Sequence, residues 1–536
     1  MKTWLAAAAA TLVALAPFDV HGQSGAERGG TVVIAGASDL RAMNSLVAAE
    51  TYTVEFINHV LFMPLIRYTP DLKFEPVLAR SWRMLGDTAV VFDLRRDVFW
   101  HDGRKTTAYD VAFTFDRARD SLTAFPNADY VRNYRRATVI DSFTVRVSFA
   151  PHRDALMVWP ELAIMPRHLL EHVPPAELSQ APFNKQPVGN GPFRFVSQRA
   201  NDRWVFEANP RHPAALGGQP RVERLIWRVI PDNTAQQSEL LTGGADIILA
   251  ARAEQFAQLA ARPGITGVLK PSRRFYFIAW NGKRATLSQP ATRRALMHAL
   301  NRDQMIKALR GGYATIATGP IAPYHWAHDK SLAPLRYDPQ TAIRLLESNG
   351  WRDRNRDGVR ENAAGEPLQI ELKIPANNGF NRDLAEMIRS DLSKVGVRVT
   401  TRPIDFAALV DDISTPERRF DAAILAFDTD FNINLRDAFH SKELEGPFQS
   451  SSYRNPRVDA LLDAVSKATD RERARQLYAD VQRILRDEQP WGFLFYPPEL
   501  IVKSDRVQGT QFDIRGVLAG VEKWYTGPRR GSTARD

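Results

Sequence analysis

The chain has 536 residues, of which 44% are hydrophobic and 25% are charged, a composition typical of a globular protein. One hydrophobic core rarely serves so long a chain, so we expect two or three lobes. The lack of cysteine excludes disulfide bonds, a cysteine nucleophile and a lipid anchor attached through cysteine. The net charge of +10 comes from arginines spread along the chain, which indicates a solvated basic surface and argues against a nucleic-acid partner.

The first residues have the pattern of a secretory signal peptide. Lys2 precedes an apolar run from Trp4 to Ala16, which is too short to span a bilayer. The residues at Val20 and Gly22 suit the last positions before a cleavage site, so we expect residues 1–22 to be removed after Gly22. An exported protein without a lipid anchor is expected to be periplasmic.

Strand and helix patterns alternate along the rest of the chain, without a fixed repeat or a low-complexity linker. Residues 31–38 are predicted to form a short apolar strand. Residues 81–104 are predicted to form hairpins, because apolar and polar residues alternate there. A helix is expected over residues 107–120, with Thr107 as its N-cap and Asp110 three residues later.

The second half of the chain has clearer helix signals. Two helices are expected within residues 288–312, and another within residues 337–351. A βαβ unit then follows, with a strand over 368–375, a helix over 381–396 and a strand over 397–404. Such a unit implies a parallel sheet whose carboxyl ends are available to a ligand.

The loop after the 337–351 helix resembles the start of a calcium-binding loop, because Asp353, Asn355 and Asp357 alternate and a glycine follows. An EF-hand also needs a glutamate at the twelfth position, which is Ala364 here, and a second helix where we expect a strand. Three arginines interleave with the acidic residues and would repel a cation. We therefore predict a connector with Asx turns and no metal site.

Seven segments between about residues 31 and 510 carry motifs that occur together in one family. They include VFWHDGRKTTAYDVAFTFDRA (98–118), PVGNGPFRFV (187–196), ATRRALMHALNRDQMI (291–306) and YRNPRVDALLDA (453–464). In this order the segments resemble the family 5 extracellular solute-binding proteins, the dipeptide- and oligopeptide-binding components of ATP-driven importers. Each motif alone is weak, whereas seven in the family's order are specific.

The resemblance implies an α/β fold of the type 2 periplasmic binding protein class, bilobal with hinge strands and an extra inserted middle lobe. It assigns residues 23–66, 190–275 and 490–536 to lobe one, residues 67–189 to the middle lobe and residues 276–489 to lobe three. The aromatic-rich strands 273–280 and 491–497 are expected to cross between lobes one and three. Ligand binding between these lobes would close them about the hinge.

The resemblance also places an acidic residue of lobe three against the amino terminus of a bound peptide. The segment FDAAILAFDTDFN (420–432) matches the family pattern, with Phe427 in place of a tryptophan and Asp430 as the pairing acid. If the register shifts by two residues, the pairing acid is Asp428.

Lobe one is expected to contribute contacts at Tyr52 and Thr53, and the family layout has Trp280 and Asn281 facing the cleft. The protein would then be an extracytoplasmic binding protein that captures a peptide-like ligand and delivers it to the permease and ATPase of an ABC importer. We expect a monomer without a cofactor. An oligosaccharide, an opine or a metal complex as ligand stays open, as does a chaperone or sensor-docking role on the same scaffold.

One segment offers an enzymatic alternative. HLLEH matches the H-x-x-E-H motif of zinc peptidases, with His168, Glu171 and His172 as the candidate residues. Flanking prolines leave room for only about two helical turns. The chain has no G-x-S-x-G elbow and no P-loop lysine motif, so we predict a binding protein and not an enzyme.

Overall fold

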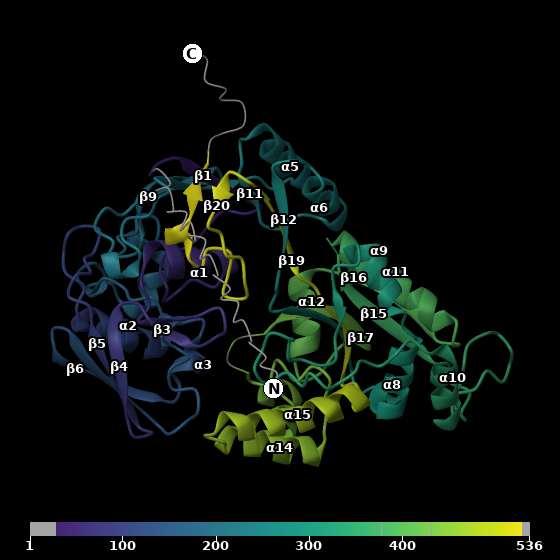
Figure 1. The fold of residues 1–536 in the computed structure, drawn as a ribbon. Helices are drawn as coiled ribbons and strands as arrows, with labels where there is room; N and C mark the ends of the chain where they lie inside the picture. The colour runs from purple at the N-terminus through teal and green to yellow at the C-terminus, as the bar shows by residue number, and fades with distance from the viewer. Residues whose placement is uncertain (1–27, 377, 430, 432, 528–536) are drawn as a thin grey trace, which may run out of the picture.

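The computed structural model describes residues 28–376, 378–429, 431 and 433–527, and the predicted signal peptide lies outside them. Three large sheets organise these residues, with seven, four and six strands. Figure 1 shows the seven-stranded sheet running from the upper left to the centre of the molecule, the four-stranded sheet at the lower left and the six-stranded sheet at the right. The described residues are therefore organised around more than one sheet.

The seven-stranded sheet combines strands from both ends of the chain. Its order is β12 (Ile265–Lys270), β19 (Glu499–Ser504), β11 (Ile247–Ile248), β1 (Thr31–Gly36), β10 (Arg224–Val229), β9 (Arg203–Ala208) and β8 (Phe193–Arg199). Strand β1 is parallel to β10 and β11, and β19 is antiparallel to β11 and β12. The strand predicted within residues 31–38 is β1.

The four-stranded sheet is antiparallel and is formed by one continuous segment. Its order is β4 (Ala79–Leu85), β5 (Ala89–Leu94), β7 (Thr144–Phe149) and β6 (Tyr134–Asp141). Helix α2 (Ala108–Arg119) packs against β6. Its N-terminus is the predicted capping box, in which the Asp110 carboxylate accepts from the Thr107 backbone N–H at 2.8 Å.

The six-stranded sheet has the order β14 (Thr315–Ile316), β18 (Trp491–Tyr496), β13 (Arg274–Trp280), β17 (Ala422–Asp428), β15 (Gln369–Pro375) and β16 (Arg398–Ile404). Strands β15 and β16 are parallel and are joined by α11 (Gly379–Ser393), which confirms the predicted βαβ unit. The other predicted helices are also present, as α8 (Pro290–Ala299), α9 (Arg302–Arg310) and α10 (Pro339–Ser348). Helices α14 (Pro456–Lys467) and α15 (Arg471–Glu488) pack together beneath the sheet (Figure 1).

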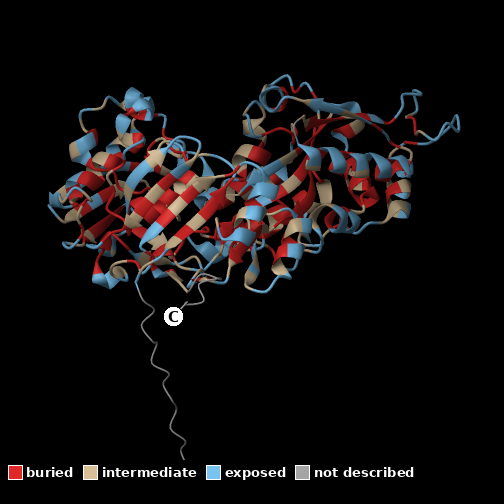
Figure 2. Cartoon of the chain, turned by 90° about the horizontal axis from the view of Figure 1, so that it is seen from above, coloured by how far each residue is buried: buried red, intermediate tan, exposed pale blue. Residues whose placement is uncertain are grey.

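The six-stranded sheet is buried on both faces. Along β13, Phe275, Phe277 and Ala279 belong to one apolar cluster, whereas Ile278 and Trp280 belong to the cluster on the other face. Figure 2 shows buried residues along the strands and exposed residues on the outer sides of the helices. This arrangement fixes the register of the strands, because a slip of one residue would move every side chain of a strand to the opposite face of the sheet.

Two crossings join the seven-stranded sheet to the six-stranded sheet. The chain passes from β12 to β13 through Pro271, and returns from β18 to β19 through Pro497 and Pro498. Strand β18 pairs with β13, so it lies in the six-stranded sheet, whereas the sequence-based limit at residue 490 assigned it to lobe one. We therefore propose that lobes one and three meet at residues 271–273 and 497–498.

The PVGNGPFRF motif (residues 187–195) forms hydrogen bonds with residues 61–63, which lie much earlier in the chain. The backbone N–H groups of Asn190 and Gly191 donate to the Leu61 carbonyl, and the Asn190 side chain accepts from the Met63 N–H at 2.9 Å. A Cβ at Gly189 would lie only 1.9 Å from the Leu61 carbonyl oxygen. The glycines of this motif are therefore required by close backbone approach.

We expect Gly189→Ala to lower the free energy of unfolding by about 1–3 kcal/mol, because the backbone that it meets cannot move aside easily. Urea denaturation measures this. Gly379→Ala is the matched control, because a Cβ at Gly379 meets nothing within 4 Å and its φ is not positive. It should change stability by less than about 1 kcal/mol. Equal stabilities of the two variants would contradict the packing argument.

Candidate functional site: the cleft at the hinge

A cleft of about 850 Å³ lies at the two crossings, and we call it the hinge cleft. The seven-stranded and six-stranded sheets and the helices beside them line it. Residues on the side of the seven-stranded sheet include Thr51, Tyr52, Glu55, Lys270, Glu499 and Arg515, and those on the side of the six-stranded sheet include Arg274, Tyr276, Arg310, Phe380, Asp383 and Asp428. The cleft is therefore shared between the parts that the crossings connect.

Charged residues of both signs line the hinge cleft, six of them basic and five acidic. The nearly buried Lys270 ammonium pairs with the Glu499 carboxylate at 2.9 Å. Arg274 donates to both oxygens of Asp428, at 3.0 and 2.7 Å, and this contact raises the pKa of Arg274. Asp428 is thus already engaged by a bidentate arginine.

Glu55 lies buried at one side of the hinge cleft. Its carboxylate accepts backbone N–H groups of Val517 and Leu518, at 2.6 and 3.1 Å. Gly516 leaves room for this group, because a Cβ there would lie 2.7 Å from the Glu55 carboxyl carbon. Burial raises the pKa of Glu55 from 4.5 to about 7, although Lys270 acts in the opposite direction. Burial therefore favours the protonated form of Glu55.

Arg310 forms a flat cationic wall of the hinge cleft. Its guanidinium lies 4.5 Å from the ring centre of Phe380 and 5.3 Å from that of Tyr276. Burial lowers the pKa of Arg310. The two rings hold the guanidinium without neutralising it, so this charge is available to an anionic group.

A second cavity of about 460 Å³, the aromatic pocket, lies on the other side of β17. Its lining includes the rings of Phe275, Phe427, Phe439, Phe448 and Trp491, and residues between Pro126 and Asn133. Phe427 faces the aromatic pocket and its neighbour Asp428 faces the hinge cleft, since successive residues of a strand point to opposite sides.

The lobe-one candidates have different surroundings. Tyr52 lines the hinge cleft, and its ring packs on Trp227 with centroids 5.4 Å apart. Thr53 is buried within the same part of the chain, and its hydroxyl accepts from the Arg41 backbone N–H at 3.1 Å. Because that hydrogen bond is internal and the side chain does not line the hinge cleft, Thr53 has a structural role there.

The expectation that Trp280 and Asn281 face the cleft is wrong. Both are 1% exposed, and the Asn281 amide donates to the carbonyls of Arg418 and Phe420. The reason is the antiparallel register, which pairs Arg274 with Asp428 at one end of β13 and Trp280 with Ala422 at the other, about 20 Å away. The crossing is at the Arg274 end, so the far end of the strand lies in the core.

The predicted acid Asp430 lies outside the described residues. Its neighbour Thr429 lines the aromatic pocket, and the Thr429 hydroxyl is 2.8 Å from that of Tyr324. Glu55, Lys270, Arg310 and Glu499 also line the hinge cleft and were not predicted from the sequence. A usable signal was present for two of them, because Lys270 and Glu499 directly flank the proline breaks between the crossing strands.

The HLLEH segment does not converge on a common point. Helix α4 (Arg167–Leu170) has only four residues, and the His168 Nε2 atom lies 2.6 Å from an Asp102 oxygen. Glu171 pairs with Arg167 at 2.7 Å, and the His172 side chain is 88% exposed. Glu171 also lies 3.8 Å from the His172 Nε2 atom, whereas His168 pairs with Asp102, so the two histidines have different carboxylate partners and do not share one metal-binding arrangement.

Residues 73–436 match the model of the bacterial extracellular solute-binding proteins, family 5. This chain belongs to that family. A search of curated proteins finds it 26% identical, over 93% of its length and 92% of the relative's, to the oligopeptide-binding protein AppA of Bacillus subtilis.

Solved structures of the family share the fold. AppA from Bacillus subtilis in complex with a nonapeptide has a TM-score of 0.78 and 24% identity, with 94% of this chain and 100% of that chain covered. NikZ from Campylobacter jejuni in complex with Ni(L-His) has a TM-score of 0.76 and 23% identity, with 92% and 99% covered. The predicted α/β solute-binding fold is thereby confirmed. No helix of the described residues is long and apolar enough to cross a membrane.

The raised pKa of Glu55 predicts a pH-dependent stability. The pKa of Glu55 is about 7 in the folded protein and 4.5 in the unfolded chain. Its contribution to the free energy of unfolding is therefore fully present below about pH 4.5 and is lost as the pH rises through 7. Glu55→Gln keeps an uncharged side chain at every pH. The stability of wild type relative to Glu55→Gln should therefore fall by up to about 3 kcal/mol between about pH 5 and 8.

Urea unfolding of both proteins at several pH values measures this difference. All other titrating groups are present in both proteins, so their contributions cancel when the two unfolding free energies are subtracted. A difference that is constant, or that grows in favour of the wild type as pH rises, would contradict the assignment.

Proposed function

We propose that this protein captures a peptide in the hinge cleft and delivers it to an ABC importer. The observation that carries the proposal is a cleft at the hinge, lined from both sides by basic and acidic side chains. A free peptide is a zwitterion, and its two termini can pair with groups of both signs. Family membership and the oligopeptide-binding relative support the same conclusion.

The proposal includes a location and partners. The pattern of residues 1–22 supports export with cleavage near Gly22, and the mature protein would act as a periplasmic monomer with a permease and an ATPase. Amino-terminal sequencing of the exported protein should find a start near Gln23, and Met1 at the terminus would contradict it. Binding, and not catalysis, is the proposed activity, because the one peptidase-like motif is engaged elsewhere.

Closure about the two crossings would enclose the ligand. The crossings consist of short proline-containing connections, and the sheets on either side are each hydrogen-bonded throughout. Bending at residues 271–273 and 497–498 would therefore move the lobes without breaking either sheet.

We expect a saturating peptide to reduce the radius of gyration, as measured by small-angle X-ray scattering. Peptides of two to nine residues are suitable probes. Unchanged scattering, under conditions where calorimetry shows that the peptide is bound, would contradict closure.

The proposed anchor for the peptide ammonium is Asp430. Removing it would leave an ammonium unpaired in a closed cleft, which costs about 2–5 kcal/mol. We therefore expect Asp430→Ala to weaken peptide binding by roughly 30-fold or more in isothermal titration calorimetry. Amino-acetylated peptides should bind the wild type weakly, and the variant should bind them no worse.

Asp428→Ala is the comparison variant, because Asp428 is already paired with Arg274. A loss confined to Asp428→Ala would assign the anchor to Asp428. If neither variant affects binding, the ligand has no ammonium to hold, and a non-peptide solute replaces the peptide in the proposal.

A further inference from the structure

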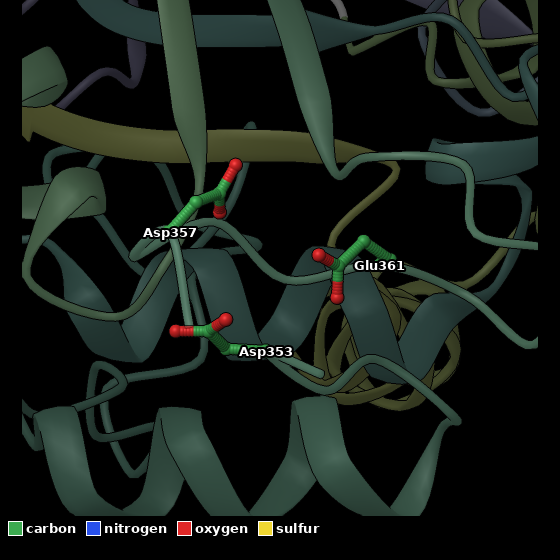
Figure 3. A group of neighbouring side chains, drawn as sticks. All are labelled: Asp353, Asp357 and Glu361. Atoms are coloured by element: carbon green, nitrogen blue, oxygen red, sulfur yellow. The ribbon is translucent and has the colours of Figure 1, made fainter. Parts of the chain in front are cut away.

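We propose that the loop between α10 and β15 binds a calcium ion through Asp353, Asp357 and Glu361. One carboxylate oxygen from each residue lies within 4.8 Å of one oxygen from each of the others, and Figure 3 shows the three side chains around a common point. Three like charges so close together repel one another, and a divalent cation between them would remove that repulsion.

The buried member of the group provides the second observation. Glu361 is 6% exposed, and its Oε2 atom accepts from the Arg354 backbone N–H at 2.9 Å. Its Oε1 atom is buried and has no hydrogen-bond partner. A buried carboxylate oxygen without a partner is unfavourable, because it has lost water and gained nothing in exchange. A bound cation would supply the missing partner.

The backbone holds Glu361 beside the start of the loop. Arg352 and Glu361 exchange two backbone hydrogen bonds, at 3.0 and 2.9 Å, so the loop is closed at its base. Glu361 is thereby brought back to Asp353, although eight positions separate them. It occupies the ninth position of the loop, whereas the EF-hand pattern has its bidentate glutamate at the twelfth.

Two arginines packed near the loop, Arg360 and Arg398, do not take the place of a cation. Arg360 is buried and directed away, toward the carbonyls of Trp351 and Val395 and the Glu347 carboxylate. Arg398 approaches Asp357 at 3.7 Å, but both side chains are about half exposed, so this contact is weak.

Calcium fits this donor set better than other common cations. All the available atoms are oxygens, and Ca²⁺ takes 6–8 oxygen ligands in a flexible arrangement. Asn355 can contribute its side-chain oxygen, which accepts from the Asp357 N–H at 2.9 Å and keeps a second lone pair. Magnesium needs a near-ideal octahedron and gives up its waters reluctantly. None of these residues lines the hinge cleft or the aromatic pocket.

The test is calcium titration of the mature protein after treatment with a chelator. We expect calorimetry to show one calcium site that saturates below about 1 mM, with magnesium at least about tenfold weaker. Calcium should also raise the Tm by about 2 °C or more, because it binds only the folded loop.

The decisive variants are Asp353→Asn and Asp357→Asn, because both residues are exposed and their loss should leave the fold intact. Each should weaken calcium binding at least about tenfold and abolish the Tm shift. Asp87→Asn, an exposed aspartate in the β4–β5 turn, is the matched control and should bind calcium like the wild type.

The proposal would be overturned if the wild type showed neither a calorimetric binding signal nor a Tm shift at calcium concentrations up to about 10 mM. Unchanged calcium affinity in both loop variants would also overturn it. Peptide binding should be the same with and without calcium in every protein, so this test is independent of the proposed transport function.

Discussion

The chain crosses twice between the seven-stranded and the six-stranded sheet, at residues 271–273 and 497–498, and the rest of the structure depends on this double crossing. On one side of it β12 and β19 pair, and on the other side β13 and β18 pair. The prolines between them have no N–H to continue a hydrogen-bonded ladder, so both strands change sheet at the same place. The side chains that flank the prolines, such as Lys270, Arg274 and Glu499, consequently line the cleft.

Several charged side chains of the hinge cleft are already paired with one another. Lys270 is paired with Glu499 and Arg274 with Asp428, and burial favours the neutral form of Glu55. A charged ligand would compete with these ion pairs. Its binding free energy is therefore the difference between the contacts that it forms and the ion pairs that it displaces. Strand β17 separates this polar cleft from the aromatic pocket. A polar peptide backbone suits the first of these cavities, and apolar peptide side chains suit the second.

Local patterns were enough to predict many of the elements, because each has its signals within a few residues. The Thr107–Asp110 capping box and the two helices within 288–312 are examples, and the βαβ unit of β15, α11 and β16 follows from alternating periodicities. The site could be predicted only in part. The motif named Phe427, Asp430 and, as the alternative acid, Asp428, and the structure places Phe427 in the aromatic pocket and Asp428 in the hinge cleft. Trp280 was misplaced because strand register determines which end of β13 meets the hinge.

The sequence by itself determined the family, the βαβ unit and the acidic loop, since these depend on residue order and short-range spacing. Only the tertiary structure decided which charges meet. Lys270 and Glu499 are more than 200 residues apart, and antiparallel pairing of β12 with β19 brings them together. In the same way, the closed base of the 352–361 loop places Glu361 beside Asp353 and Asp357. Hydrogen bonding between distant backbone segments fixed these neighbours, and a linear motif contains no information about that pairing.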